Sequence, residues 1–144
     1  MIKVKDVMTQ NPHTLLQSHT LADAKNTMQA LDIRHIPIVN EHHHLLGLVS
    51  LSDVLSAQES MLQNDLDKQS KVMETLLLEV MTTHIKTISS KADLKECALE
   101  MHKHKLGCFP VVEKGELVGI ITDGDFIVIA IDLLERFEKI QDDS

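Results

Sequence analysis

A chain of 144 residues, 43% of them hydrophobic, can bury one core or two small ones that share a boundary. Its formal charge of −8 excludes a general binder of nucleic acid or of anionic membranes, because contacts to phosphates need a basic surface. The longest nearly uninterrupted apolar run, residues 126–131, is too short to cross a bilayer. Cys97 and Cys108 show neither the spacing of a metal site nor a disulfide pattern, so we expect a reduced, cytoplasmic protein.

The first half of the chain reads as strand, helix, two strands and helix. In chain order we expect an extended segment at 14–16, a helix at about 21–31, strands at 36–39 and 46–49, and a second helix after Ser50. Thr20 with Asp23 signals the first helix start. The apolar residues of that helix fall on a single stripe, which predicts that they are core residues: Leu21, Ala24, Met28 and Leu31.

The second half repeats this order at a nearly constant distance. Residues 7–9 and 80–82 both read Val-Met-Thr, and Pro37 matches Pro110, each pair being 73 residues apart. After the prolines the separation is 72, so one residue has been lost in a hairpin loop, where length changes cost little. Asp93 with Glu96 signals the equivalent helix, whose stripe is Leu94, Cys97, Ala98 and Met101. A proline inside each first hairpin strand marks that strand as an edge, or marks the start of the strand.

Two further segments lie outside the repeat. Residues 56–78 are polar and mostly helical by pattern, with apolar residues available to pack: Met61, Leu62, Leu66, Val72, Met73 and Leu76. Residues 126–140 are apolar on more than one helical face, which predicts a homodimer through this helix. The alternative is that residues 126–131 are buried within one chain, because β-branched residues leave helix and strand hard to tell apart.

Neither repeat unit could bury two helices and a three-stranded sheet by itself. We therefore expect an α+β (α/β-like) fold of two β-α-β-β-α units packed about a pseudo-twofold axis.

A hydroxyl residue followed three positions later by aspartate opens the second helix of each unit. These pairs are Ser50 with Asp53 and Thr122 with Asp125. One reading is a capping box that only satisfies the helix end. The other is a binding site, in which the carboxylate accepts hydrogen bonds from ribose hydroxyls while the helix N-terminus faces a ribose or phosphate. Gly124 leaves room for close backbone approach and favours the second pair for binding.

Doubling, order and spacing together carry a family resemblance. Two copies of a unit that begins VMT, passes through IRHIPIV or LGCFPVV, and closes GLVSLSD or GIITDGD resemble a tandem pair of cystathionine-β-synthase (CBS) domains, a Bateman module. The resemblance covers about residues 4–131. It implies CBS domain 1 at residues 1–57, a helical linker at 58–78, CBS domain 2 at 79–132, and a C-terminal helix extension and tail at 133–144.

The resemblance also implies a ligand. The family binds adenosine-containing molecules such as AMP, ADP, ATP, S-adenosylmethionine or NAD in clefts between paired units. The aspartate holds the ribose, and the base lies between the first extended segment and the residues before the strand proline. The residues we expect at the nucleotide site are Thr14, Arg34, His35, Ile36, Pro37, Ser50, Asp53, Thr87, Cys108, Phe109, Pro110, Thr122 and Asp125.

Some of these residues have a plainer explanation. Ile36 and Phe109 are equally explained by core packing. Arg34 could clamp a phosphate or be solvated, and its counterpart is Gly107, so the two sites cannot be equivalent. Residues 42–44 are consecutive histidines with no fixed partners, which favours a solvated loop over a metal site. Lys103 or Lys105 could reach a phosphate, although the negative end of a helix dipole explains their position.

The sequence contains no catalytic motif, so we expect no enzyme, no catalytic residue, no metal and no required cofactor. The function that we expect is a stand-alone, dimeric regulatory protein that senses an adenosine-containing ligand, AMP, ADP or ATP first and S-adenosylmethionine second. Its output goes to an unidentified protein partner, not to nucleic acid or a membrane. The alternatives are a ligand-free scaffold that docks a partner through its apolar C-terminal helix, and a metal-dependent nucleotide hydrolase that uses Asp53 and Asp125.

Overall fold

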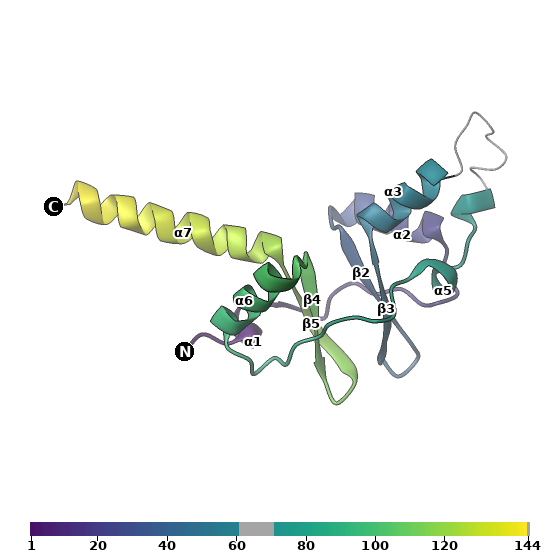
Figure 1. The fold of residues 1–144 in the computed structure, drawn as a ribbon, viewed down its shortest axis with the longest axis horizontal. Helices are drawn as coiled ribbons and strands as arrows, with labels where there is room; N and C mark the ends of the chain where they lie inside the picture. The colour runs from purple at the N-terminus through teal and green to yellow at the C-terminus, as the bar shows by residue number, and fades with distance from the viewer. Residues whose placement is uncertain (61–70, 144) are drawn as a thin grey trace.

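The computed structural model describes residues 1–60 and 71–143, which form helices packed on two small sheets (Figure 1). The helices are α1 (Val4–Val7), α2 (Leu21–Leu31), α3 (Leu51–Ser60), α5 (Leu77–Val80), α6 (Leu94–His104) and α7 (Asp123–Asp142). The strands are β1 (Thr9–Gln10), β2 (His35–Val39), β3 (Leu45–Ser50), β4 (Cys108–Glu113) and β5 (Glu116–Thr122). The expected α+β fold with its duplicated helix, hairpin and helix is confirmed.

The two hairpins repeat one another in detail. β2 pairs with β3 and β4 pairs with β5, both antiparallel, and the prolines lie opposite Leu48 and Ile120. Each hairpin register shifts at the same place, between Ile38 and Val39 in one and between Val111 and Val112 in the other. β1 adds to the second hairpin by pairing with β5. The duplication in the amino-acid sequence is therefore also a duplication of backbone geometry.

Each predicted first strand is reduced to a single parallel bridge. Leu15 bridges Ile38, and Ile88 bridges Val111. The Leu15 N–H donates to the Pro37 carbonyl at 3.2 Å, and the Val39 N–H donates to the Leu15 carbonyl at 3.0 Å. β2 and β4 each lie at the edge of their sheet, with only this isolated bridge on the outer side, so the edge reading of the prolines is confirmed. The prolines lie where this parallel pairing begins, so their missing N–H groups cost no hydrogen bond.

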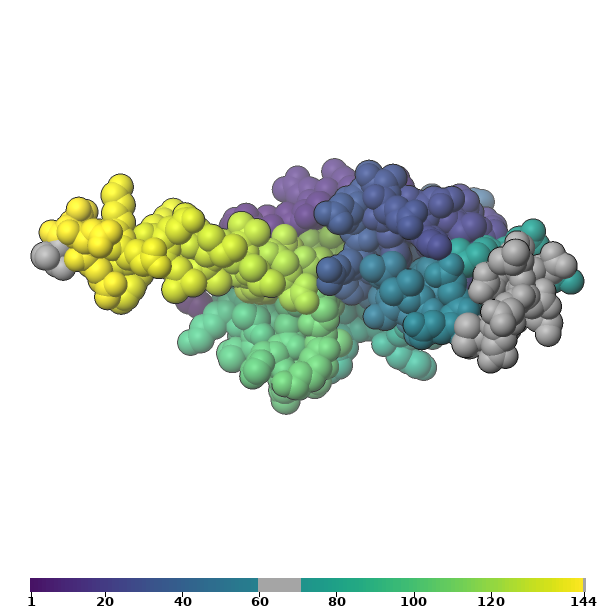
Figure 2. Space-filling model, turned by 90° about the horizontal axis from the view of Figure 1, so that it is seen from above, coloured from purple at the N-terminus to yellow at the C-terminus, as the bar shows by residue number. Residues whose placement is uncertain are grey.

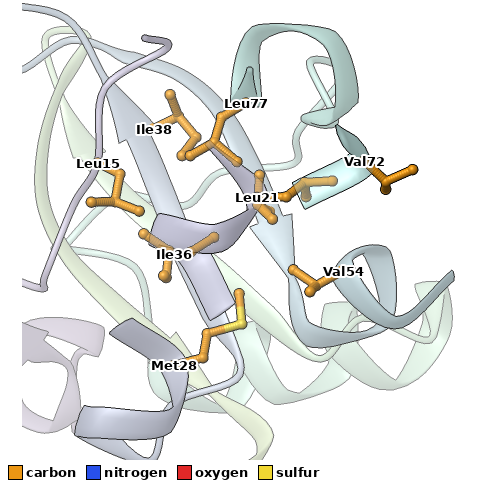
Figure 3. Packing of buried hydrophobic residues seen from close by; sticks show 10 residues of the cluster. Leu15, Leu21, Met28, Ile36, Ile38, Val54, Val72 and Leu77 are labelled. Carbon is orange, nitrogen blue, oxygen red and sulfur yellow. The ribbon is translucent and has the colours of Figure 1, made fainter. Parts of the chain in front are cut away.

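Two hydrophobic cores lie one beneath each hairpin, and each takes a segment from the far half of the chain. The first contains Leu21, Ile36 and Val54 together with Val72 and Leu77 (Figure 3). The second contains buried residues of α6, β4 and β5 together with Val4, with Val7 and Met8 packed against it. Val4 and Leu77 are 73 residues apart, so the two opening segments have exchanged cores. The predicted domain boundaries after residues 57, 78 and 132 stay a prediction. Each core contains residues from both sides of at least one of these boundaries.

The caps of α2 and α6 differ although their helices are equivalent. At α2 the Thr20 hydroxyl accepts from the Asp23 N–H at 3.2 Å and the Asp23 carboxylate accepts from the Thr20 N–H at 2.9 Å, as predicted. At α6, Asp93 makes no capping hydrogen bond and instead pairs with Lys3. The helix start predicted from Asp93 and Glu96 is confirmed, but the Asp93 side chain does not cap it, because a nearby ammonium group binds this carboxylate more strongly than a backbone N–H would.

The helical stripes are largely buried, with two exceptions. Leu21, Ala24 and Met28 are buried, whereas Leu31 is 49% exposed at the end of α2. In the linking segment Val72 is buried, but Leu76 is 40% exposed and the core position belongs to Leu77. The predictions for Met61, Leu62 and Leu66 lie outside the described residues.

Helix α7 extends away from the two cores (Figures 1 and 2). Only its first turns pack inward, through Phe126 and Ile129 against the second core. The other large apolar residues of the helix are more than half exposed: Ile127, Val128, Ile131, Leu133, Leu134, Phe137 and Ile140. The alternative that residues 126–131 are buried within one chain is therefore wrong. The described part of the chain contains no helix with the length and apolar character needed to span a bilayer.

Candidate functional site

The openings of α3 and α7 carry the repeated hydroxyl and aspartate pairs. The Asp53 carboxylate accepts from the Ser50 N–H at 2.8 Å, and the Ser50 hydroxyl accepts from the Asp53 N–H at 3.1 Å. Thr122 and Asp125 form the same box, with the Thr122 N–H donating at 2.8 Å. Both bonds to the carboxylates use Oδ2. In the described residues Oδ1 of Asp53 has no hydrogen-bond partner, so capping leaves one oxygen of that carboxylate available to a ligand.

The start of each first hairpin strand lies against the helix opening of the same unit. The Leu51 N–H donates to the Arg34 carbonyl at 2.8 Å, and the Asp123 N–H donates to the Gly107 carbonyl at 3.0 Å. These bonds satisfy the first N–H of each helix and fix the residues just before the strands beside the helix N-termini.

Two cavities lie between the units. The first has a volume of about 410 Å³. Its walls combine the opening of α3 with the segment before Thr87 and the end of α6, through His35, Leu48, Ser50, Asp53, Thr82, His84, Ile85, Lys86, His104, Leu106, Gly107 and Cys108. The second has a volume of about 650 Å³ and combines the opening of α7 with the segment before Thr14 and the end of α2. Its residues are Thr9, Asn11, Pro12, His13, Leu31, Asp32, Ile33, Arg34, His35, Ile120, Thr122, Asp123, Gly124 and Ile127.

The two sets of lining residues are images of one another under the sequence repeat. Thr9, Pro12 and Ile33 of the second cavity lie 73 positions before Thr82, Ile85 and Leu106 of the first. Ser50 of the first lies 72 positions before Thr122 of the second. Both volumes fall in the range of about 300–1,000 Å³ typical of small-molecule sites. The structure therefore contains two related clefts, each walled by both units.

Comparison with known proteins identifies this architecture. The CBS domain family model matches the chain twice, over residues 4–60 and 77–132. The chain belongs to the CBS domain family. The resemblance seen in the sequence is thereby confirmed, and the two units form a CBS pair.

Solved CBS proteins share the arrangement. A Vibrio cholerae protein named for acetoin utilization (AcuB) is 56% identical, with a TM-score of 0.82, and the match covers 96% of this chain and 97% of that one. The CBS domain pair of protein MJ0100, solved in complex with 5′-methylthioadenosine and S-adenosyl-L-methionine, is 26% identical, with a TM-score of 0.76 and coverage of 90% and 95%.

The curated relatives that match first are much longer proteins. Homoserine O-acetyltransferase of Methanococcus vannielii is 25% identical over 83% of this chain, which corresponds to 23% of the enzyme. The CBS pair thus spans about a quarter of the length of such relatives.

The residues predicted for the nucleotide site divide into two groups in the CBS pair. Ser50, Asp53, His35 and Cys108 line the first cavity, whereas Arg34, His35 and Thr122 line the second. The other predicted residues are not among those lining either cavity: Thr14, Ile36, Pro37, Thr87, Phe109, Pro110 and Asp125. Ile36 and Phe109 belong to the two cores, in line with the core-packing alternative, and Pro37 and Pro110 are also buried.

Several lining residues were not predicted. His84, Lys86 and His104 border the first cavity, and Asp123 borders the second in place of Asp125. The sequence carried no signal for them, because only the structure shows that each cavity pairs the helix opening of one unit with the segment before the first strand of the other.

His35 occupies a special place because it lines both cavities. A Cβ atom at Gly107 would lie 3.2 Å from the His35 Nε2, so the imidazole packs against the opposite unit where no side chain intervenes. Burial lowers the pKa of His35, and the carboxylates of Asp123 and Asp53 only partly oppose this shift. The neutral imidazole is therefore favoured between the two clefts.

The two thiols are buried and unpaired with one another. Burial raises the pKa of Cys108 to about 12, with the Asp123 charge adding to the shift, and raises the pKa of Cys97 to about 11. Neither thiol is therefore disposed to act as a thiolate nucleophile or metal ligand. Among residues 1–60 and 71–143, no group of three or more His, Cys, Asp or Glu side chains is arranged to hold a metal ion.

Proposed function

We propose that this CBS pair is a regulatory module that binds an adenosine-containing ligand in one or both of its clefts. The observation that carries the proposal is the paired cavities, each with a helix N-terminus and a hydroxyl residue from one unit and strand-start residues from the other. The MJ0100 pair, which is 26% identical, was solved with two adenosine-containing compounds, and this supports the ligand class.

In the first cavity, Asp53 accepts hydrogen bonds from the ribose hydroxyls. Its Oδ2 is held by the Ser50 N–H, which fixes the orientation of the carboxylate before a ligand arrives. Apolar contact to the base comes from Leu48, Ile85 and Leu106, which line the same cavity.

In the second cavity, Thr122 and the N-terminus of α7 face the ligand, and Arg34 binds its anionic group. Asp125 holds the ribose only if the ligand reaches beyond the lining residues, so Asp123 is the second candidate for this role.

The regulatory output is a change in how the units pack. Because each cleft is walled by both units, a ligand that prefers one arrangement shifts the population by its difference in affinity, typically about 1–3 kcal/mol. The relative named for acetoin utilization is 56% identical, so that process is where we would first seek the protein partner.

The protein acts as a homodimer through α7 in this proposal. Seven large apolar residues of that helix are more than half exposed, and monomers rarely expose contiguous apolar patches beyond a few hundred Å². The same observation favours the second candidate function, a scaffold that docks a partner through α7 with no ligand in its clefts.

Thermal denaturation with AMP, ADP, ATP and S-adenosylmethionine tests the proposal. A ligand present at 100 times its dissociation constant stabilises the fold by about 2.7 kcal/mol, which is readily measured. Asp53→Asn, which keeps the side-chain volume, should weaken binding in the first cavity. Asp6→Asn on α1, whose residue lines neither cavity, is the matched control. If none of the four compounds raises the melting temperature, the sensor is refuted and the scaffold is favoured.

A further inference from the structure

The two cavities differ in charge at equivalent positions. Three positions of the first cavity carry His84, Lys86 and His104, where the second has Asn11, His13 and Leu31. Each of these pairs is 73 residues apart, so the comparison is between matched places in the repeat. The two clefts therefore share lining positions, while the first carries cationic and protonatable groups that the second lacks at these places.

Two of these groups form a cluster at the wall of the first cavity. Lys86 Nζ lies 3.0 Å from His104 Nε2, and the same ring nitrogen lies 3.1 Å from Glu100 Oε2. An ammonium group can only donate, so this geometry places a donor and an imidazole nitrogen at one point. In the tautomer with its proton on Nε2, His104 could donate to a phosphate oxygen to which Lys86 also donates, in the place now taken by the exposed Glu100 carboxylate.

The remaining charges leave a difference of one unit between the cavities, which is the charge of Lys86. With histidines neutral, the first cavity is lined by one cation, Lys86, and one carboxylate, Asp53, for a sum of zero. The second is lined by Arg34 against Asp32 and Asp123, for a sum of −1. The second cavity is the larger, so discrimination between ligands by phosphate number must come from charge and not from size.

We propose that the first cavity is a polyphosphate site, in which Lys86 and His104 bind the terminal phosphates of a nucleoside di- or triphosphate whose ribose lies at Asp53. The second cavity takes a nucleoside with one phosphate or none. This inference rests on the proposed function, because it assigns a ligand subclass to each cleft. Ser50 and Asp53 come from one unit and Lys86 and His104 from the other, so the bound polyphosphate connects the two units.

The test measures binding of AMP, ADP and ATP by titration calorimetry in magnesium-free buffer, where the phosphate charge is not masked. The variant is Lys86→His with His104→Leu, which gives the first cavity the residues of the second. The matched control is Lys103→Met, which removes a cation from the same helix outside the cavity. Asp53→Asn identifies which binding event belongs to the first cavity.

The expected result is that the Asp53-dependent site prefers ATP over AMP, and that the exchange variant lowers this preference by about fivefold or more, as for loss of an ionic contact of about 1 kcal/mol. Lys103→Met should leave the preference unchanged. The inference is overturned if AMP and ATP bind at the Asp53-dependent site with equal affinity, or if the exchange variant keeps the preference; the proposed function survives either outcome. Absence of binding by all three nucleotides overturns this inference, and it overturns the proposed function as well if S-adenosylmethionine also fails to bind.

Discussion

Two equivalent glycines should respond differently to the same substitution. Gly47 in β3 and Gly119 in β5 are 72 residues apart, and each backs onto the methionine of a VMT segment, Met81 or Met8. The three heavy atoms nearest to a Cβ atom at Gly47 would all belong to the Met81 side chain, at 2.4, 2.7 and 3.0 Å. A Cβ atom at Gly119 would meet Met8 Sδ at 2.5 Å and also the Thr9 carbonyl oxygen at 2.9 Å.

The loss of folding free energy in each variant depends on whether the atoms that meet the new Cβ can move. Neither glycine lies in the left-handed region, so alanine is allowed by the backbone and gains about 0.4–1 kcal/mol through the unfolded state. Overpacking in a tight core costs about 1–3 kcal/mol. Met81 is flexible and can swing aside, so Gly47→Ala should cost between about 0 and 1 kcal/mol. Gly119→Ala must displace the backbone of β1, so we expect a cost of about 2 kcal/mol.

Urea unfolding followed by circular dichroism measures both costs. The midpoints should fall in the order wild type, Gly47→Ala, Gly119→Ala, with unchanged slopes. Thr9 lines the second cavity, so Gly119→Ala should also weaken a ligand there more than in the first cavity. A cost for Gly47→Ala equal to or above that of Gly119→Ala would refute the reasoning from backbone contact.

Three other predictions follow from burial and charge. Burial holds the pKa of His35 below its ordinary value of about 6.5, so the unfolded chain takes up the proton at a higher pH than the folded protein. The free energy of unfolding should therefore be full above pH 6.5 and fall as the pH drops toward the folded pKa. His35→Gln should remove this part of the decline in urea midpoints. Cys97 and Cys108 should react with a thiol reagent at pH 8 only on the timescale of unfolding, and rapid labelling in native buffer would contradict their raised pKa values. Phe137→Glu on α7 should convert a dimer to a monomer in light scattering. It should change the melting temperature of dilute protein little, since the Phe137 side chain is 60% exposed. An unchanged molecular mass would count against dimerisation through that helix.

Much of the fold could be predicted from the sequence because the patterns that indicate its helices and strands are local. The stripe from Leu21 to Met28, the box of Thr20 with Asp23, and the hairpin strands depend on residues a few positions apart. The start of α6 at Asp93 was also predicted, but the partner of its carboxylate was not, because Lys3 comes from the other end of the chain.

The candidate site was predictable only in part for the same reason. Local sequence predicted several of the lining residues. The helix-start pattern indicated Ser50, Asp53 and Thr122, and the position before the strand proline indicated Arg34 and His35. Lys86 and His104 carry no signal of their own, because they join Asp53 in lining the first cavity only through the packing of one unit against the other.

The sequence by itself determined that this protein is a duplicated CBS unit, since composition, hydrophobic periodicity and the 73-residue offset between the copies need no knowledge of which residues meet in space. Only the tertiary structure decided that Val4 and Leu77 exchange cores and that the helix opening of one unit meets the segment before the first strand of the other. Those choices follow from which apolar faces can be buried together in space, and burial depends on shape and distance, which no local pattern encodes.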